Sequence, residues 1–186
     1  MSQTPRLRAG LFIPCCEVDQ MEKSPYIQDY YPDDLAWCYG CGRYNEHGHH
    51  FKTRWDGDET VTRFTPAPYH IAIPGFVYGG LLASLVDCHS TGSAALAAYR
   101  AEGHEPGDDA PVPRFVTADL HVTYRKPTPL GVELEARGRI KEITDRKVIV
   151  ETTVYANGEA CVTGEAVLVK MPKHMIPKDV PVPKQG

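Results

Sequence analysis

The stretch Tyr78-Gly79-Gly80-Leu81-Leu82-Ala83-Ser84-Leu85-Val86-Asp87 is the least polar helix-like segment of the chain. The pattern continues to about Ala101, so we predict one long helix over residues 78–101. At helical spacing the small and polar residues fall on one stripe, which contains Gly80, Ala83, Ser84, Asp87, Ser90, Thr91 and Ala94. The leucines lie beside this stripe and would bury the helix. Another molecule can therefore approach the stripe closely.

Asp87 is the most informative residue of this helix. An ionised carboxylate in apolar surroundings costs several kcal/mol unless it is paired or hydrogen-bonded. Gly79 and Gly80 open the helix, and its first N–H groups are free for a ligand. The segment therefore predicts an acid, base or nucleophile two turns beyond an oxyanion site. The alternatives are a buried structural aspartate held by nearby Ser or Thr hydroxyls, or an exposed aspartate.

Composition limits the class of protein. The chain has 186 residues, 42% of them hydrophobic and 24% charged, which suits one soluble globular domain. The net charge of -4 gives no general attraction to nucleic acid or anionic membrane. No apolar run approaches the roughly 20 residues of a membrane helix, and no export signal is evident. We therefore expect a cytoplasmic protein whose six cysteines are thiols.

Turn signals divide the rest of the chain into strands and loops. Residues 51–54 and 60–64 flank Asp56-Gly57-Asp58, which predicts a hairpin before the helix. Residues 66–77 and 103–113, rich in Pro and Gly, are predicted to be loops, and the second has no helix or strand period. Four strands follow the helix, over residues 116–124, 132–140, 147–155 and 159–169.

The alternation in residues 116–124 predicts one buried face, formed by Val116, Ala118, Leu120, Val122 and Tyr124. Asn157-Gly158 is the best type I′ hairpin dipeptide of the chain. The order β-β-α-β-β-β-β predicts an α+β protein, with an antiparallel sheet wrapped around one long central helix. We divide the chain into an N-terminal extension (1–37), a main domain (38–171) and a tail rich in Pro and Lys (172–186).

Three stretches carry a resemblance to a known family, which covers roughly residues 36–170. They are Cys38-Tyr39-Gly40-Cys41-Gly42-Arg43-Tyr44-Asn45-Glu46-His47-Gly48, then Tyr78-Gly79-Gly80 followed by Asp87, and Val116 to Pro127 with Leu130-Gly131. Together they resemble the hotdog-fold thioesterases, and most closely the PaaI-like group within the 4-hydroxybenzoyl-CoA thioesterase-like superfamily. The resemblance implies a hotdog fold and hydrolysis of an acyl-CoA thioester to a free acid and coenzyme A.

The resemblance also implies roles for single residues. Asp87 would act as nucleophile or as general base on water, and the N–H of Gly79 would polarise the thioester carbonyl. Thr117 matches a Ser or Thr that positions the water or the Asp. The strand phase places Thr117 opposite the apolar face, so this role requires a neighbouring subunit or a bulge.

Substrate contacts are expected from further residues. Gly80 and Ser84 lie on the small stripe, and Arg125 and Lys126 would bind the phosphates of coenzyme A or else be solvated. Family members usually carry His at the position of Tyr78, and many carry an amide side chain at the position of Ala72. His70 or Tyr69 could take the place of that amide, or both could be ordinary loop residues.

The cysteine pair Cys38-x-x-Cys41 has three readings: packed thiols, a redox pair, or part of a zinc site with His47, His49 or His50. A tetrahedral site needs four ligands, and the sequence has no second such pair, so we expect packed thiols and no metal or cofactor. Cys88 and His89 are not expected to act as a catalytic pair, because adjacent helix positions do not face each other.

Three functions remain to be compared. An acyl-CoA thioesterase fits best, and a non-catalytic binder of acyl-CoA or an aromatic ligand is the second candidate, favoured by Tyr78. A hotdog dehydratase needs a loop His and a helix Glu, but Ser84 stands fourteen residues after His70. We further expect a homodimer or a dimer of dimers, with the strand over residues 116–124 as its edge.

Overall fold

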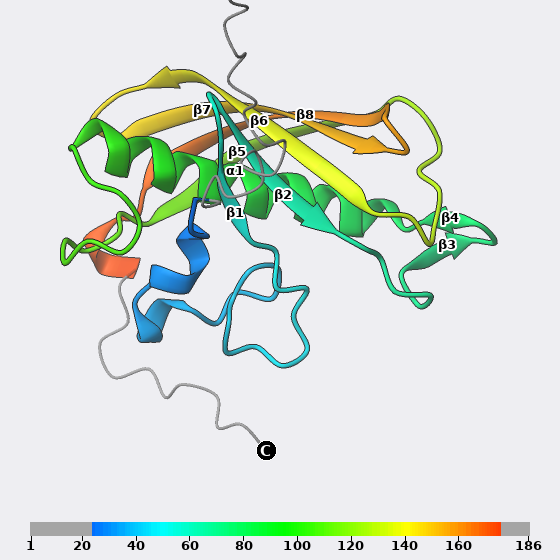
Figure 1. Cartoon of the computed structure of the whole chain (residues 1–186), viewed down its shortest axis with the longest axis horizontal. Coiled ribbons are helices and arrows are strands. Elements are labelled where there is room, and N and C mark those ends of the chain that lie inside the picture. Colours follow the sequence, from blue (N-terminus) through cyan, green and yellow to red (C-terminus); the bar gives the residue numbers. More distant parts are fainter. Residues whose placement is uncertain (1–23, 176–186) are drawn as a thin grey trace, which may run out of the picture.

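The computed structural model describes residues 24–175 and shows one long helix lying across an antiparallel sheet (Figure 1). The elements that position the site are β1 Thr53–Asp56, β2 Glu59–Phe64, α1 Gly79–Ala101, β5 Phe115–Tyr124, β6 Leu134–Ile143, β7 Lys147–Ala156 and β8 Glu159–Lys170. The six strands pair in the order β1-β2-β6-β7-β8-β5. The predicted α+β hotdog architecture is therefore confirmed, and α1 begins one residue after its expected start.

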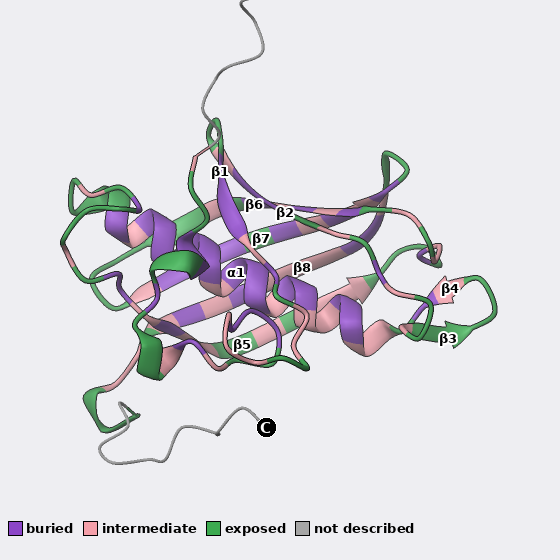
Figure 2. Ribbon diagram, turned by 60° about the horizontal axis from the view of Figure 1, so that its bottom comes forward, coloured by how far each residue is buried: buried purple, intermediate pink, exposed green. Residues whose placement is uncertain are grey.

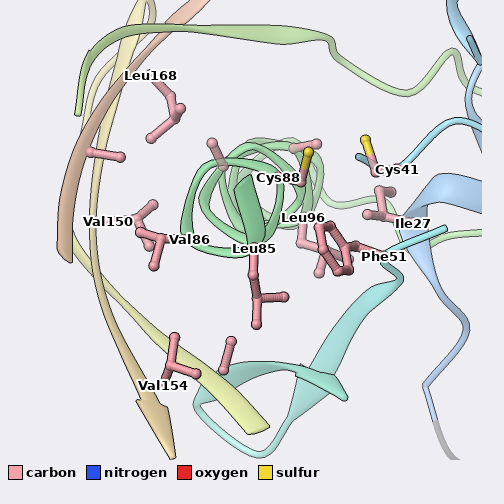
Figure 3. Close-up of a cluster of buried hydrophobic side chains, with 14 of the residues drawn as sticks. Ile27, Cys41, Phe51, Leu85, Val86, Cys88, Leu96, Val150, Val154 and Leu168 are labelled. Carbon is pink, nitrogen blue, oxygen red and sulfur yellow. The ribbon is translucent and has the colours of Figure 1, made fainter. Parts of the chain in front are cut away.

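The core lies between α1 and the concave face of the sheet (Figure 3). Leu85 and Val86 of α1 are fully buried, and they meet Val150, Val154 and Leu168 from the sheet. Each such side chain contributes about 1.5–3 kcal/mol when it leaves water. Within residues 24–175, no helix combines the length and the apolar character that crossing a bilayer requires.

The opposite face of the sheet is charged. Arg137 forms ion pairs with Asp56 at 2.8 Å and with Glu135 at 2.6 Å, and Lys141 pairs with Glu165 at 2.5 Å. Apolar residues face the helix and charged residues face away from it, as expected for an antiparallel sheet covered on one side.

The segment over residues 66–77 was predicted as a loop, and that prediction is wrong. It contains a short hairpin of β3 Ile71–Ile73 and β4 Phe76–Val77, which projects from the end of the molecule (Figure 1). Pro74-Gly75 makes its turn, and Gly75 has a φ of 89°, which suits the third residue of a type II turn. Ile71 and Ile73 are both exposed, so the hairpin has no inside-outside alternation for a sequence reading to detect.

Strand β5 departs from the expected alternation because it contains a bulge. Thr117 pairs with Leu168 and Asp119 pairs with Val167, so Ala118 is the extra residue. A bulge of one residue reverses the faces on its two sides. Val116 is therefore opposite Val169 on the outer face instead of the predicted buried face, and Thr117 faces the helix.

Residues 24–37 pack against the domain through two short 3₁₀ helices, η1 Ile27–Tyr30 and η2 Asp33–Leu35. Ile27 is fully buried, and the side chain of Gln28 bonds both the backbone N–H and the hydroxyl of Thr53, at 2.7 and 3.1 Å. A third short helix, η3, spans Lys173–Met175. Most of the predicted extension and tail, residues 1–23 and 176–186, lies outside the described residues.

Candidate active site

Asp87 lies on α1 with its side chain half-buried against β5. The hydroxyl of Thr117 donates a hydrogen bond to Asp87 Oδ1 at 2.5 Å. The bulge therefore turns Thr117 toward Asp87, although strict alternation along the strand placed Thr117 on the opposite face. Among residues 24–175, Asp87 Oδ2 has no hydrogen-bond partner, so one oxygen is available to a water or a substrate.

The environment of Asp87 changes its acidity. Burial raises its pKa, the hydrogen bond from Thr117 lowers it, and the negative charge of Cys38 raises it again. The pKa of Asp87 is therefore raised overall. A carboxylate whose pKa moves toward neutrality is a better proton acceptor from water, as general base catalysis requires.

The start of α1 forms the second part of the site. The earliest i to i−4 bond of the helix runs from the N–H of Leu82 to the carbonyl of Tyr78 at 3.4 Å, which leaves the N–H groups of Gly79 and Gly80 without an acceptor inside the helix. A β-carbon on Gly80 would lie 2.2 Å from the hydroxyl oxygen of Tyr78, so the phenol lies directly over this helix start. Two backbone donors and one phenol therefore gather where a carbonyl oxygen could bind.

Tyr124 is a site residue that the sequence analysis missed. Its hydroxyl donates to the carbonyl of Gly79 at 2.8 Å, and a β-carbon on the same glycine would lie 3.5 Å from its ring. The end of β5 thus braces the helix start. No local signal marks Tyr124, because its position depends on how β5 is placed against α1.

The predicted small stripe is only partly open. Gly80, Ala83, Ser84, Asp87 and Thr91 are half-buried, and Figure 2 shows the start of α1 less buried than its middle. Ser90 and Ala94 are buried instead, and the hydroxyl of Ser90 contacts that of Thr152 at 3.1 Å. The accessible part therefore runs from the helix start to Thr91.

His70 organises the approach to the helix. Its carbonyl accepts the N–H of Tyr78 at 2.9 Å, and its Nδ1 accepts the N–H of Ala67 at 3.0 Å. Its ring packs against that of His49, and burial lowers its pKa. His70 therefore holds the loop before α1 in place through its main chain and its ring.

The two predicted phosphate-binding cations lie at the exposed end of β5, next to Tyr124. Arg125 Nε donates to the hydroxyl of Thr163 at 3.2 Å, and Lys126 pairs with Glu159 at 3.3 Å. Tyr124, which precedes them in the chain, contacts the helix start, so the two cations lie near it. Their role in binding the phosphates of coenzyme A stays a prediction.

His89 does not act with Cys88. It is fully buried, its Nδ1 contacts the hydroxyl of Thr62 at 2.8 Å, and burial lowers its pKa to about 3. Cys88 lies beside Cys38 instead, with their sulfurs 3.8 Å apart. The two side chains therefore point to different neighbours, as the helix spacing predicted.

Comparison with known proteins agrees with this architecture. The sequence profile of the Thioesterase superfamily matches residues 74–163, which span the helix start and Asp87. A thioesterase superfamily protein from Shewanella loihica PV-4 has a solved structure with 49% sequence identity and a TM-score of 0.56, covering 69% of this chain and 96% of that chain. The chain belongs to the thioesterase superfamily.

Two further similarities place this superfamily member among its relatives. The acyl-coenzyme A thioesterase THEM4 of Mus musculus is 31% identical over 107 residues, 58% of this chain and 40% of that protein. The chain therefore spans about two fifths of the length of this curated relative. The structure of the PaaI protein of E. coli covers 67% of this chain and 81% of its own, with 11% identity and a TM-score of 0.54, so the two share the fold.

Proposed function

We propose that this protein is an acyl-CoA thioesterase, which hydrolyses a thioester to a free acid and coenzyme A. The observation that carries the proposal is that one helix holds both a half-buried Asp87, hydrogen-bonded by Thr117, and free N–H groups at its start. The name of the THEM4 relative supports the substrate class. The cytoplasmic location expected from the sequence is part of the proposal.

The geometry suggests how the reaction proceeds. The thioester carbonyl binds at the helix start, where the N–H of Gly79 stabilises the negative charge that develops on its oxygen. Asp87 removes a proton from a water while the water oxygen attacks the carbonyl carbon. The carbon–sulfur bond then breaks, and the coenzyme A thiolate leaves. Direct attack by Asp87, through an anhydride that water cleaves, uses the same groups.

The spacing of these groups supports a site shared by two chains. Gly79 and Asp87 are eight residues apart, which separates them by about 12 Å along the helix axis. That is too far for both to act on one carbonyl carbon. We therefore propose a homodimer, or a dimer of dimers, in which Gly79 of one copy faces Asp87 of the other.

The edge of the sheet suits such a dimer. β5 is an end strand of the sheet, and it carries Thr117 and Tyr124, which contact the two parts of the site. Leu120 and Val122, on the side that faces the helix, are only half-buried in the single chain. A second copy that joins at β5 would cover them and would pair the free strand edge.

The function is tested by turnover on short, long and aromatic acyl-CoAs, with release of free thiol as the readout. The expected result is hydrolysis of at least one class, abolished in the Asp87→Asn variant. Tyr78 favours the alternative of a non-catalytic binder, since a phenol stands where family members usually carry the imidazole of His. Tight binding of acyl-CoA without turnover would establish the binder and refute the esterase.

We expect Thr117→Val to move the acidic limb of the pH profile of kcat/KM to higher pH. Valine keeps the shape and the strand preference but removes the donor that lowers the pKa of Asp87. Asp87 must be ionised to act, so a higher pKa lowers the fraction of active enzyme at acidic pH. The expected loss there is about tenfold, near the lower end for a hydrogen bond to a charged group.

Thr123→Val is the matched control for this variant. Thr123 lies on the same strand, and its hydroxyl contacts His121 Nε2 at 3.2 Å instead of the site. The control should keep the wild-type profile. An unshifted limb in Thr117→Val would show that the contact with Asp87 has no role in turnover.

We expect Tyr78→Phe to lower kcat/KM by about fivefold, the effect of about 1 kcal/mol for one neutral hydrogen bond. The phenol lies over Gly80 at the helix start, where it can orient the bound carbonyl. If the phenol instead protonated the leaving thiolate, the loss would reach about 100-fold in kcat. A hundredfold fall in kcat with unchanged substrate binding would contradict the orienting role.

A further inference from the structure

Three cysteines converge beside the site. Cys38 and Cys41 come from the loop before β1, and Cys88 comes from α1, one residue after Asp87. Their sulfur atoms all lie within 4.8 Å of one another. Figure 3 shows the sulfurs of Cys41 and Cys88 on the same side of the helix. The fold therefore adds a third sulfur, that of Cys88, to the Cys38–Cys41 pair.

The loop that carries Cys38 and Cys41 is built around these sulfurs. The N–H of Gly42 donates to the carbonyl of Cys38 at 2.8 Å, which closes a tight turn. The sulfurs of Cys38 and Cys88 are in hydrogen-bond contact at 3.8 Å, and either can be the donor. A β-carbon on Gly40 would lie 2.2 Å from the sulfur of Cys88, so a glycine is needed for the loop to reach the helix.

Buried polar groups next to the cluster lack partners. Within residues 24–175, the hydroxyl of Tyr31 and the Nε and Nη1 atoms of Arg114 are buried without a hydrogen bond. The guanidinium of Arg114 lies 3.5 Å from the centre of the Tyr31 ring. Unsatisfied buried donors are rare, and each costs about 1–3 kcal/mol.

Electrostatics place these orphaned groups at the cysteines. Tyr31 lies within electrostatic range of Arg114 and of all three cysteines. Arg114 also lies close enough to Cys41 for its positive charge to act on that sulfur. The half-buried guanidinium of Arg114 and the buried hydroxyl of Tyr31 therefore lie beside three sulfurs, an arrangement that suits an anionic centre.

We propose that Cys38, Cys41 and Cys88 bind one Zn²⁺ ion as three thiolates, with the fourth coordination position open to solvent. Zinc-bound thiolates at about 2.3 Å in a tetrahedral site lie about 3.8 Å apart, and the sulfurs of Cys38 and Cys88 are 3.8 Å apart. Three thiolates and Zn²⁺ carry a net charge of -1, which Arg114 balances.

Binding of the ion is a proton exchange without redox change. Each cysteine binds the ion as a thiolate, so any thiol proton of the cluster is released to solvent as Zn²⁺ binds. The ion joins the loop at residues 38–41 to α1 next to Asp87. Cys38 is exposed and gives the ion a route into the cluster. The proposal does not depend on thioesterase activity.

The test uses the full chain, stripped of metal by a chelator and kept reduced. Titration with Co²⁺ should give thiolate-to-cobalt charge-transfer absorption that saturates at one ion per chain and disappears when Zn²⁺ is added. Zn²⁺ should also raise the melting temperature of the reduced protein. Cys38→Ser and Cys88→Ser should each weaken Zn²⁺ binding by about 100-fold or more, since each removes one of three ligands.

Two matched controls separate this site from the other cysteines. Cys161→Ser removes a buried free thiol outside the cluster, and Cys15→Ser with Cys16→Ser removes the pair outside the described residues. Both variants should bind Zn²⁺ with wild-type affinity. The proposal is overturned if the reduced wild-type chain shows no cobalt–thiolate absorption, if Cys88→Ser binds Zn²⁺ as tightly as the wild type, or if the Cys15 and Cys16 double variant loses binding.

Discussion

Replacement of Asp87 by asparagine is expected to lower kcat by about 10²–10⁴-fold, the range for loss of a general base, and to leave the fold intact. Asparagine fills the same volume and still accepts the hydrogen bond from Thr117. It cannot take a proton from water or attack the carbonyl. Release of free thiol from the preferred acyl-CoA measures the loss. Asp119→Asn, at an exposed carboxylate on β5, is the matched control and should keep full activity.

The stability of the Asp87→Asn variant provides a second check. Burial raises the pKa of Asp87 in the folded chain above its unfolded value. The stability that it contributes is therefore present below the unfolded pKa and is lost as the pH rises through the folded pKa. At neutral pH the variant should melt at the same temperature as the wild type or higher. A large fall in melting temperature together with the loss of turnover would indicate a structural aspartate.

The second large effect is expected for Gly79→Pro, which should lower kcat by about 10²–10³-fold, the usual loss for one oxyanion donor. Proline removes the N–H that we assign to the thioester carbonyl. Gly79 is the first residue of α1, where proline is tolerated, and Tyr78 before it has the extended conformation that proline favours (φ -62°, ψ 129°). The helix should therefore persist, which circular dichroism can verify.

Gly79→Ala is the control, because it keeps the N–H. A β-carbon at this position would lie 3.5 Å from the ring of Tyr124, an ordinary contact, so the variant should retain most activity. Equal losses in the alanine and proline variants would show that the shape of the helix start matters, and that the N–H is not the donor.

The same variants test the shared site. If Gly79 and Asp87 act across two chains, a mixed dimer of Gly79→Pro and Asp87→Asn contains one intact site. Co-expression of the two inactive chains should restore up to about half of the activity per mixed dimer, since a two-fold interface makes two equivalent sites. A stable monomer in sedimentation at micromolar concentration, or no recovery in verified mixed dimers, would refute the inter-subunit site.

Local sequence patterns were sufficient to predict most of the helices, strands and turns. The helix over Gly79–Ala101 follows from apolar spacing and the opening glycines, and the turn at Asn157-Gly158 follows from two residues with positive φ (51° and 78°). The polar loop at residues 103–113 also has no helix or strand in the structure. The β3–β4 hairpin was missed because its exposed Ile71 and Ile73 give no burial pattern.

The long helix, the antiparallel strands and the candidate residues Gly79 and Asp87 could be predicted from local patterns, because helix period, strand period and turn chemistry are properties of neighbouring residues. Only the tertiary structure placed Thr117 against Asp87, since a bulge at Ala118 shifts the strand by one residue. It also brought Tyr124 to Gly79 and Cys88 to Cys38, across 45 and 50 residues. Such contacts depend on the register and packing of distant elements, for which no local pattern in the chain carries a signal.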